Sequence, residues 1–254
     1  MSNSPKICLV GATGRMGREI ARRAQVVCGI VESGASEESL EGFDFPIGTA
    51  FNDCCPTINI VVDFSTPTGT EKARAIATSL SVPLLVGTTG LDDAQRAALE
   101  RDSSQIPVLV SGNFSLGINA MQLLVEQAVK LLPEADVEVL DIHHRAKVDA
   151  PSGTAFMLAQ SALKGRGGES KSALITSRDD VKAARKPGEI TLQSLRGGGV
   201  PGEHTVYLFS DSERIEITHR AGDRGIFADG AVKAASWLIG KSPGFYSMRD
   251  VLGA

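Results

Sequence analysis

The sequence predicts an α/β protein in two domains, a parallel-sheet domain followed by an α+β domain whose sheet is mostly antiparallel. Three observations carry this prediction. From residue 6 to residue 110, short apolar strands alternate with helical stretches, which is typical of a parallel sheet with crossover helices. After Asn113 the period changes to that of one long amphipathic helix. Three β-patterned segments then follow one another, and the short link Asp211-Ser212 favours a hairpin between the last two.

Composition and charge narrow the class of protein. The 254 residues can bury one or two cores, and 42% hydrophobic with 22% charged residues is typical of a globular enzyme. A net charge of -4 disfavours binding to nucleic acid, and no apolar run reaches the ~20 residues that span a bilayer. We therefore expect neither a nucleic-acid partner nor a membrane partner.

The cysteines and the N-terminus indicate a cytoplasmic protein. Cys8, Cys28, Cys54 and Cys55 have no CxxC spacing, and the first two fall in predicted buried strands. This pattern predicts reduced thiols, with neither a disulfide framework nor a metal site. Residues 1–6 lead directly into the first strand and leave no room for a signal peptide.

The first structural unit is a strand from Lys6 to Val10, a glycine loop, a helix to about Ala24 and a second strand at 26–31. The loop reads GATGRMG, with glycines at 11, 14 and 17. Such glycines let the backbone approach a pyrophosphate, whose charge the helix N-terminus stabilises. Glu32, 21 residues after the first glycine, is placed to accept hydrogen bonds from a ribose diol. The unit therefore predicts a Rossmann-like dinucleotide site, the alternative being a merely tight turn.

The alternation continues along the first half of the chain. Three more strands are expected at 58–63, 82–87 and 106–110, with helices at 68–80 and 92–102 between them. Each strand runs into small and polar residues, which read DFSTP, GTTG and SGNFS. One such cluster alone is an ordinary loop. The carboxyl ends of parallel strands share one edge of a sheet, so these three clusters and the glycine loop together predict a cofactor cleft.

The second half is organised around HHRAKVDAPSGTA at 143–155, which follows an amphipathic helix at 118–132 and a strand at 137–142. Neighbouring residues of a strand point to opposite faces, so His143 and His144 cannot share one pocket in a regular strand. Once the chain turns, His143 and Lys147 can share one. The segment therefore combines an imidazole with a cationic amine.

The same segment enters a helix. Ser152 is placed as its N-cap, and the N–H groups of Gly153 and Thr154 form a ready site for a carboxylate or phosphate. Together with Lys147 this predicts an acidic small molecule as ligand. The alternative, which the residues alone leave open, is two solvated histidines at a strand end and an ordinary capped helix.

Strands at 189–196, 205–210 and 213–220 build the rest of the second domain. Their apolar residues exceed what one short helix covers, so we expect a second subunit to cover them in a homo-oligomer. These residues are Ile190, Leu192, Val206, Leu208, Ile215 and Ile217.

Two loops flank these strands. RGGGVPGEH at 196–204 is rich in glycine and predicts either a mobile lid or a loose surface turn. In the segment 220–231, Arg224 either binds an acid or is solvated. A helix follows to about Ile239, with Trp237 and Leu238 expected to pack on the first domain. We expect residues 1–112 plus about 221–254 to form the dinucleotide-binding domain and 113–220 the substrate-binding and oligomerisation domain.

These motifs together resemble one family, the dihydrodipicolinate reductases of bacterial and plant lysine biosynthesis. GATGRMG, DFS, GTTG, NFSLGIN, HHRAKVDAPSGTA, RGGGVPGEHT and ITHRAGDRGIFADGA occur in the family's order over nearly the whole chain. The resemblance implies a Rossmann domain joined to an α+β substrate domain, usually in a homotetramer. It also implies hydride transfer from NADH or NADPH to a cyclic dicarboxylate of the diaminopimelate and lysine pathway, giving tetrahydrodipicolinate.

The resemblance also implies roles for individual residues. His143 resembles the family's general acid, and Lys147 its partner in proton transfer. The substrate carboxylates are expected at His144, Lys147, Ser152, Gly153 and Thr154. The cofactor is expected at Gly11, Ala12, Thr13, Gly14, Arg15, Met16, Glu32, Gly87, Thr88, Thr89, Ser111, Gly112, Asn113 and Phe114.

One departure from the family concerns the choice of cofactor. Several members carry an arginine after the ribose-binding acid and another after the DF(S/T) segment, where this chain has Ser33 and Thr66. A 2′-phosphate is held by a guanidinium and opposed by a carboxylate such as Glu32. We therefore expect NADH to serve at least as well as NADPH.

Two other functions remain as alternatives. One is a different two-domain NAD(P)-dependent reductase, of the homoserine or malate dehydrogenase kind. The other is a dinucleotide sensor without catalysis, which would be expected to have lost His143 or Lys147. Both residues are present.

Overall fold

The computed structural model describes residues 4–31, 40–51, 57–168, 174–176 and 183–254. The chain divides into two compact units, Met1–Leu116 with Gly225–Ala254, and Gly117–Arg224. The domain boundaries expected from the sequence were residues 112 and 220, and the structure divides four residues later in each case, after 116 and 224. Among the described residues, no helix is both long and apolar enough to span a membrane.

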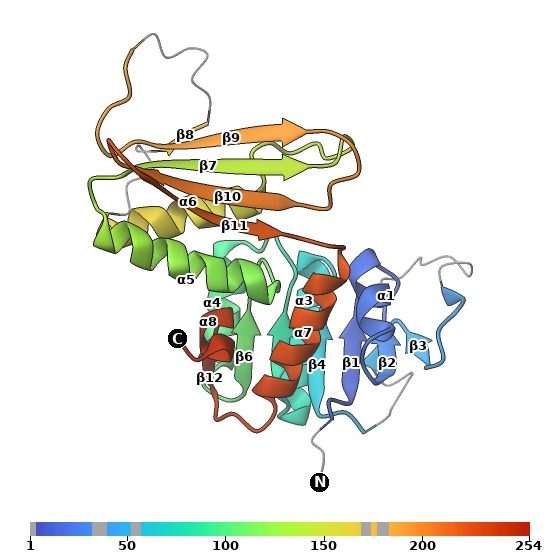
Figure 1. The fold of residues 1–254 in the computed structure, drawn as a ribbon. Helices are drawn as coiled ribbons and strands as arrows, with labels where there is room; N and C mark the ends of the chain where they lie inside the picture. The colour runs from blue at the N-terminus through green and yellow to red at the C-terminus, as the bar shows by residue number, and fades with distance from the viewer. Residues whose placement is uncertain (1–3, 32–39, 52–56, 169–173, 177–182) are drawn as a thin grey trace. The chain divides into compact units, whose positions relative to one another are not determined.

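The first unit contains a sheet of seven strands in the order β12-β6-β5-β4-β1-β2-β3 (Figure 1). All neighbouring strands pair in parallel. The strands are β1 (Ile7–Val10), β2 (Val26–Ile30), β3 (Ile47–Gly48), β4 (Ile60–Asp63), β5 (Leu84–Val86), β6 (Pro107–Val110) and β12 (Gly244–Tyr246). The strand order reverses between β1 and β4, which is the position where open α/β sheets bind ligands.

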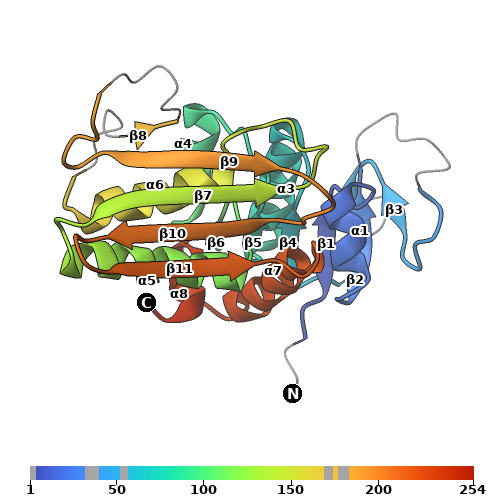
Figure 2. The same ribbon diagram turned by 45° about the horizontal axis from the view of Figure 1, so that its top comes forward.

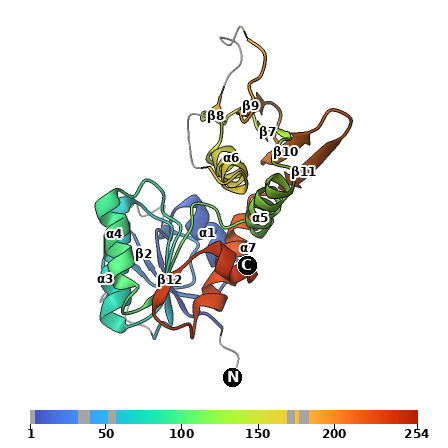
Figure 3. The same cartoon turned by 90° about the vertical axis from the view of Figure 1, so that its left-hand side faces the viewer.

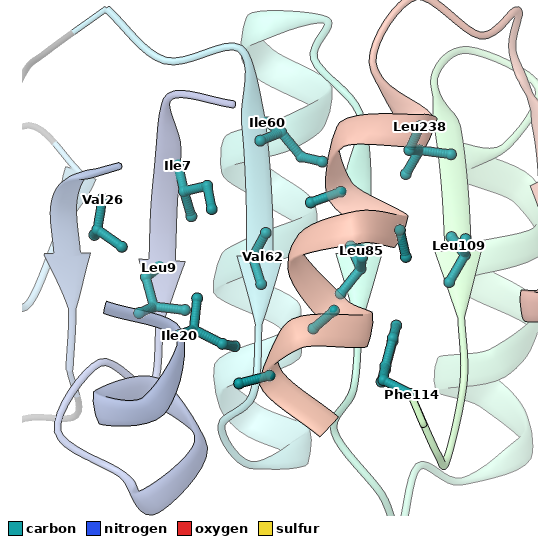
Figure 4. Packing of buried hydrophobic residues seen from close by; sticks show 14 of the residues in the cluster. Ile7, Leu9, Ile20, Val26, Ile60, Val62, Leu85, Leu109, Phe114 and Leu238 are labelled. Atoms are coloured by element: carbon teal, nitrogen blue, oxygen red, sulfur yellow. The ribbon is translucent and has the colours of Figure 1, made fainter. Parts of the chain in front are cut away.

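Helices cover both faces of this sheet (Figure 3). One face carries α3 (Pro67–Leu80) and α4 (Asp93–Asp102), and the other carries α1 (Arg15–Ala21), α7 (Gly225–Leu238) and α8 (Met248–Leu252). Successive residues of β1 serve the two cores in turn. Ile7 and Leu9 pack with α1 and α7 (Figure 4), whereas Cys8 and Val10 pack with α3 and α4. The central strands β1, β4 and β5 are therefore buried on both faces, which explains their continuous apolar sequences.

The C-terminal segment completes this unit. Leu238 of α7 is fully buried against strand residues that include Ile60 and Leu109, and Trp237 is partly buried at the same core (Figure 4). The predicted packing of these two residues on the first domain is therefore confirmed. Cys8 and Cys28 lie opposite one another in β1 and β2 and are fully buried, as expected, whereas Cys54 and Cys55 lie outside the described residues.

The second unit contains a mixed sheet of five strands in the order β11-β10-β7-β9-β8. The strands are β7 (Asp136–His143), β8 (Leu174–Ile175), β9 (Ile190–Arg196), β10 (Glu203–Phe209) and β11 (Arg214–Arg220). The expected antiparallel pairing holds for β10 with β7 and with β11, and the predicted hairpin is present. β9 pairs in parallel with both β7 and β8. This follows from the helix between β7 and β9, since a crossover connection makes two strands parallel.

Two helices, α5 (Leu116–Leu131) and α6 (Gly153–Gly165), lie on the same face of this sheet (Figures 2 and 3). Together they cover most of the apolar residues that were expected to require another subunit. Ile190, Leu192, Val206 and Leu208 are buried under them, Ile217 packs at their edge, and Ile215 alone is 41% exposed. We had expected only one helix to cover this sheet, with a second subunit covering the remaining apolar residues. The second helix makes that expectation wrong for the residues named here.

The opposite face of the same sheet carries the alternate residues of each strand. No described helix packs on this side. We call it the open face and define it by Leu140, Ile142, Leu195, Tyr207 and Phe209, of which Leu195 is 53% exposed. The rings of Tyr207 and Phe209 stack with centroids 5.7 Å apart.

Candidate active site

The glycine loop after β1 packs tightly against the segment after β4. Gly11 has a φ of 84°, and a Cβ added to it would lie 2.4 Å from the carbonyl oxygen of Phe64. A Cβ on Gly17 would lie 2.3 Å from the carbonyl oxygen of Gly11. Gly14 is the N-cap of α1 in an extended conformation. The predicted cofactor residues Ala12, Thr13, Arg15 and Met16 occupy the rest of this loop and the first turn of α1.

A buried carboxylate, Asp63, ties together the ends of β4 and β5. Its oxygens accept hydrogen bonds from the hydroxyls of Thr70 (2.6 Å), Thr88 (2.9 Å) and Ser65, and from the Ser65 N–H (3.1 Å). Burial raises the pKa of Asp63, and the hydrogen bonds from Ser65, Thr70 and Thr88 offset only part of this effect. Asp63 was not predicted as a site residue, although an acidic residue at the end of an apolar strand was a visible signal.

The loops after β5 and β6 complete the same edge of the sheet. A Cβ on Gly87 would lie 2.2 Å from the Phe64 ring, which in turn meets the Phe114 ring with centroids 5.2 Å apart. In the next loop the Ser111 hydroxyl donates to the Asn113 carbonyl at 2.8 Å, while Gly112 has open space where a Cβ would be.

The structure thus brings the predicted cofactor residues of the three loops after β1, β5 and β6 to one edge, beside the loop after β4, because β1, β4, β5 and β6 are neighbours. Only glycines fit at Gly11 and Gly17, so this edge forms a cradle of backbone close to the β1–β4 switch point. Such a cradle fits the pyrophosphate of a dinucleotide. Glu32 lies outside the described residues, and its contact with a ribose stays a prediction.

In the second unit, one face of β7 begins in the apolar core and ends in a cluster of polar side chains. Val137 and Val139 lie under the helices, and Asp141 and His143 continue the same face at the carboxyl end of the strand. Asp141 is fully buried and His143 is 8% exposed. The strand register places Arg196 of β9 beside His143. Strand alternation therefore buries two ionisable groups side by side.

Asp141 is surrounded by donors from three other segments. Its Oδ2 accepts hydrogen bonds from the Ser152 N–H (2.9 Å), the Ser194 hydroxyl (3.2 Å) and the Arg196 guanidinium (3.0 Å). Its Oδ1 lies 3.3 Å from Nε2 of His204. Burial alone would raise the pKa of Asp141, but the nearby His204 and the hydrogen bonds from Ser152 and Arg196 outweigh burial and hold the pKa well below its usual range. Asp141 is therefore an anion in the folded protein.

His143 sits directly on this anion. Its Nδ1 lies 2.7 Å from Oδ1 of Asp141. At the other side of the ring, a Cβ added to Gly202 would lie only 3.1 Å from Nε2. Burial lowers the pKa of His143 to about 4, because it outweighs the attraction of Asp141 and because His204, Lys147 and Arg196 add positive charge nearby. The imidazole is therefore neutral near pH 7 when the site holds no anionic ligand.

The segment after β7 presents the predicted anion-binding groups. Nζ of Lys147 pairs with Asp149 at 2.8 Å, where the Asp149 side chain is 60% exposed. Ser152 caps α6 as predicted, since its hydroxyl accepts from the Ala155 N–H at 3.2 Å. Gly153 begins α6 and has open space where a Cβ would be, and Thr154 follows it. A helix start with this opening can take an anion.

Two contacts here were not predicted. An Arg224 guanidinium nitrogen lies 2.9 Å from Nε2 of His144. Arginine has no acceptor, so this histidine nitrogen must accept the hydrogen bond. His204 was also missed, because its place beside Asp141 depends on the register of β10 with β7, which no local sequence signal contains.

The glycine-rich loop after β9 is not the loose turn that was one of its two expected forms. Gly197 N–H donates to the His143 carbonyl at 2.9 Å, and His144 and Arg145 donate to carbonyls of the loop at 2.8 and 3.2 Å. The loop is closed again by the Ala221 N–H, which donates to the Gly202 carbonyl at 2.9 Å. These bonds hold the loop against the residues that follow β7.

The two units define a class of protein. A parallel sheet with a glycine cradle at its switch point binds dinucleotides, and a buried imidazole beside a lysine and a helix start suits an acidic substrate. This is the architecture of two-domain, nicotinamide-dependent oxidoreductases.

Within that class, the chain belongs to the dihydrodipicolinate reductase family. Residues 5–114 match the family model described as "Dihydrodipicolinate reductase, N-terminus", and residues 117–252 match "Dihydrodipicolinate reductase, C-terminus". The family uses NADH or NADPH, and the first unit is its nucleotide-binding domain.

Comparisons with individual proteins agree. The chain is 42% identical to the 4-hydroxy-tetrahydrodipicolinate reductase of Afipia carboxidovorans and 40% identical to that of Anaeromyxobacter dehalogenans. Each match covers 98% of this chain and 97% of the relative. The fold is similar to that of a dipicolinate-bound dihydrodipicolinate reductase from Paenisporosarcina sp. TG-14, with a TM-score of 0.77 and 20% identity over 96% of this chain and 97% of that one.

The buried His143 predicts a stability that depends on pH. Its pKa of about 4 in the folded protein lies below the value of about 6.5 for an unfolded chain. Between these values the unfolded chain binds more protons, so the free energy of unfolding falls as the pH falls. Between pH 7 and pH 5, protonation of His143 in the unfolded chain should lower the free energy of unfolding by about 2 kcal/mol. Urea unfolding should show this loss in the unmodified protein and a smaller loss in His143→Gln; equal losses would contradict the placement.

Proposed function

We propose that the chain catalyses the NAD(P)H-dependent reduction of the cyclic dicarboxylate formed from 4-hydroxy-tetrahydrodipicolinate, giving tetrahydrodipicolinate in the diaminopimelate and lysine pathway. The observation that carries the proposal is the cluster at the end of β7. There a buried imidazole, a lysine and the start of α6 come together within residues 143–154. The named relatives carry the same activity over their full length.

Binding of the two substrate carboxylates is assigned to the segment 144–154 and its neighbours. Lys147 pairs in the free protein with the exposed Asp149, and exposed ion pairs contribute little free energy. A substrate carboxylate can therefore replace Asp149 at the ammonium group. The second carboxylate suits the start of α6 at Gly153 and Thr154, which Ser152 holds in place. His144, braced by Arg224, adds a neutral donor at its other nitrogen.

We assign to His143 the role of the acid that protonates the substrate after hydride transfer. A nicotinamide, when bound, would supply a hydride, that is, one proton with two electrons, to the conjugated imine of the substrate. The electron-rich enamine that results needs one proton at carbon, and the His143 imidazolium donates it from Nε2. Two substrate carboxylates nearby favour the protonated ring, so they raise the pKa of His143 from its low value in the free protein. Lys147 stabilises the same anionic charge.

Replacing the acid should slow the chemical step. We expect His143→Ala to lower kcat by roughly 10²–10⁴-fold, the usual contribution of a positioned general acid. Affinity for NADH, measured by nucleotide fluorescence, should remain unchanged, because the nucleotide cradle is built by the first unit. A loss below about tenfold in a coupled assay with freshly generated substrate would assign the acid to another residue, with His144 the next candidate.

Cofactor choice should follow the charge near the ribose. Thr66 stands where several family members have an arginine, and its hydroxyl caps α3 by accepting a hydrogen bond from the Gly69 N–H. The chain therefore has no guanidinium at this position to bind a 2′-phosphate. Glu32 and Ser33 lie outside the described residues, and their roles are proposals from sequence. We expect kcat/KM for NADH to equal or exceed that for NADPH, and Ser33→Arg to raise the NADPH value by about tenfold, or ~1.4 kcal/mol. If the unmodified protein prefers NADPH by more than tenfold, the prediction that Glu32 binds the adenine ribose is wrong.

We further propose that the chain forms a homo-oligomer, and in particular a homotetramer, through the open face. The support is a set of apolar side chains on that face, from three neighbouring strands, with the stacked rings of Tyr207 and Phe209 at one end. A cytoplasmic location is proposed as well, because the adjacent Cys8 and Cys28 are thiols and do not form a disulfide.

A charge on the open face should disrupt the oligomer. Leu195 is 53% exposed there, and we expect Leu195→Glu to shift the protein to a smaller species in light scattering after size exclusion. Leu80 at the end of α3 is 42% exposed and belongs to the first unit, so Leu80→Glu serves as the matched control. A monomer at micromolar concentration for the unmodified protein would refute the proposal.

A further inference from the structure

We propose that Asp141 is a positioning residue for the reaction: its carboxylate fixes the proton of His143 on Nδ1 and turns Nε2 toward the substrate. The inference deepens the proposed function, because it explains how His143 is held as an acid at one defined nitrogen. It rests on the burial of Asp141, on the donors around its two oxygens and on the place of Gly202.

The distance between the two side chains decides which ring nitrogen carries the proton. Nδ1 of His143 lies 2.7 Å from Oδ1 of Asp141. An ionised carboxylate only accepts hydrogen bonds, and two lone pairs at this distance repel each other. The hydrogen of a neutral His143 must therefore sit on Nδ1. Nε2 is then the nitrogen that gains and loses the exchangeable proton.

The contact is close but not yet a well-aligned hydrogen bond. In the described part of the chain, neither Nδ1 of His143 nor Oδ1 of Asp141 has a partner at hydrogen-bond geometry. A buried polar atom without a partner costs free energy, because it has lost its hydrogen bonds to water. A small rotation of the ring, as substrate binds, would align the pair and recover this free energy. Catalytic hydrogen bonds often tighten in this way when the ligand is present.

The other side of the ring is kept open by a glycine. Gly202 passes so close to Nε2 that even one added carbon would be 3.1 Å away. Any larger residue would cover the nitrogen that faces the substrate. The backbone of the loop is fixed at both ends, by Gly197 on the His143 carbonyl and by Ala221 on the Gly202 carbonyl. Asp141 and Gly202 thus act on opposite edges of one imidazole.

The charge on Asp141 is stabilised mainly by groups other than His143. Oδ2 is fully used by the Ser152 N–H, the Ser194 hydroxyl and the Arg196 guanidinium. Oδ1 is therefore left for the two imidazoles, His143 and His204. The charged and titratable groups around His143 are Asp141 on its own strand, Arg196 on β9, His204 on β10 and Lys147 in the following segment.

The same carboxylate links the acid to the predicted anion site. Asp141 binds the N–H of Ser152, and the Ser152 hydroxyl caps α6 and lies 3.2 Å from Nε2 of His204. Arg196 meanwhile donates to the Asp149 carbonyl at 2.6 Å, which braces the segment that carries Lys147. One anion therefore sets the position of both the proton donor and the groups that receive the substrate.

The test is Asp141→Asn, because its effect on the ring can be stated in advance. The three donors at Oδ2 require the amide oxygen there, which places the amide NH₂ against Nδ1 of His143. Nδ1 must then accept, and the proton of neutral His143 moves to Nε2. Ring ¹⁵N and ¹³C shifts near pH 7 should show this change of tautomer. The chain has only four histidines, so the signals can be assigned with single substitutions.

Activity should change with the tautomer. We expect Asp141→Asn to lower kcat roughly 10²-fold or more with an unchanged KM for NADH, and Asp141→Glu to recover kcat to within about tenfold of the unmodified protein. Asp102→Asn is the matched control: Asp102 is also a buried carboxylate and accepts from Arg74 at 2.7 Å, but in the first unit. It should lose stability and keep kcat within about twofold.

Three outcomes would overturn the proposal. A folded Asp141→Asn variant with kcat within about threefold is one, and a loss of kcat with the proton still on Nδ1 is another, since it would leave a merely structural role. The third outcome applies if Asp141→Asn does not fold: ring shifts that place the proton of neutral His143 on Nε2 in the unmodified protein would overturn the proposal. The ring measurement needs no substrate, so failure of the unmodified chain to reduce the dicarboxylate would refute the proposed function alone.

Discussion

One buried negative charge determines how the second unit is assembled. An ionised carboxylate without partners costs several kcal/mol to bury, so the chain must bring donors to Asp141 from elsewhere. They come from β9, from β10 and from the residue that caps α6. A slip of one residue between these strands would turn the charge or its donors to the other face of the sheet. The register of three strands and the start of one helix therefore depend on the same contact.

The first unit uses a second buried carboxylate in a different electrostatic state. Asp63 and Asp141 both end or nearly end a strand and both tie neighbouring loops together. The partners of Asp63 are hydroxyls and a backbone N–H, which do not compensate its burial, so its pKa is raised. The partners of Asp141 include the Arg196 guanidinium, and its pKa is lowered. The contrast suits the two proposed roles, because a dinucleotide brings its own negative charge whereas the proton donor proposed at His143 needs a fixed anion beside it.

Much of the fold and part of the site could be predicted from the sequence. Strand and helix positions followed from hydrophobic period, and Ser152 followed from capping chemistry. Asp141 could also have been found, because it lies two residues before His143 and so shares its face of β7. His204 and Gly202 could not, since their positions beside His143 depend on strand register and on a loop closed by long-range bonds. The second helix on the sheet was present in the sequence, but only the structure shows which face it covers.

The division of the first unit between the two ends of the chain has a consequence for synthesis. Its inner face, with Ile7, Leu9 and Ile60, is covered by α7 and α8, which follow more than a hundred residues of the second unit. A ribosome that has released residues 1–116 has therefore produced a sheet on which, of the described helices, only α1 covers part of this apolar face. Residues 117–224 are contiguous and can close their own core before the C-terminal helices emerge. The second unit is thus expected to be native first, and the nucleotide cradle is completed last, when the end of the chain closes the sheet that its beginning started.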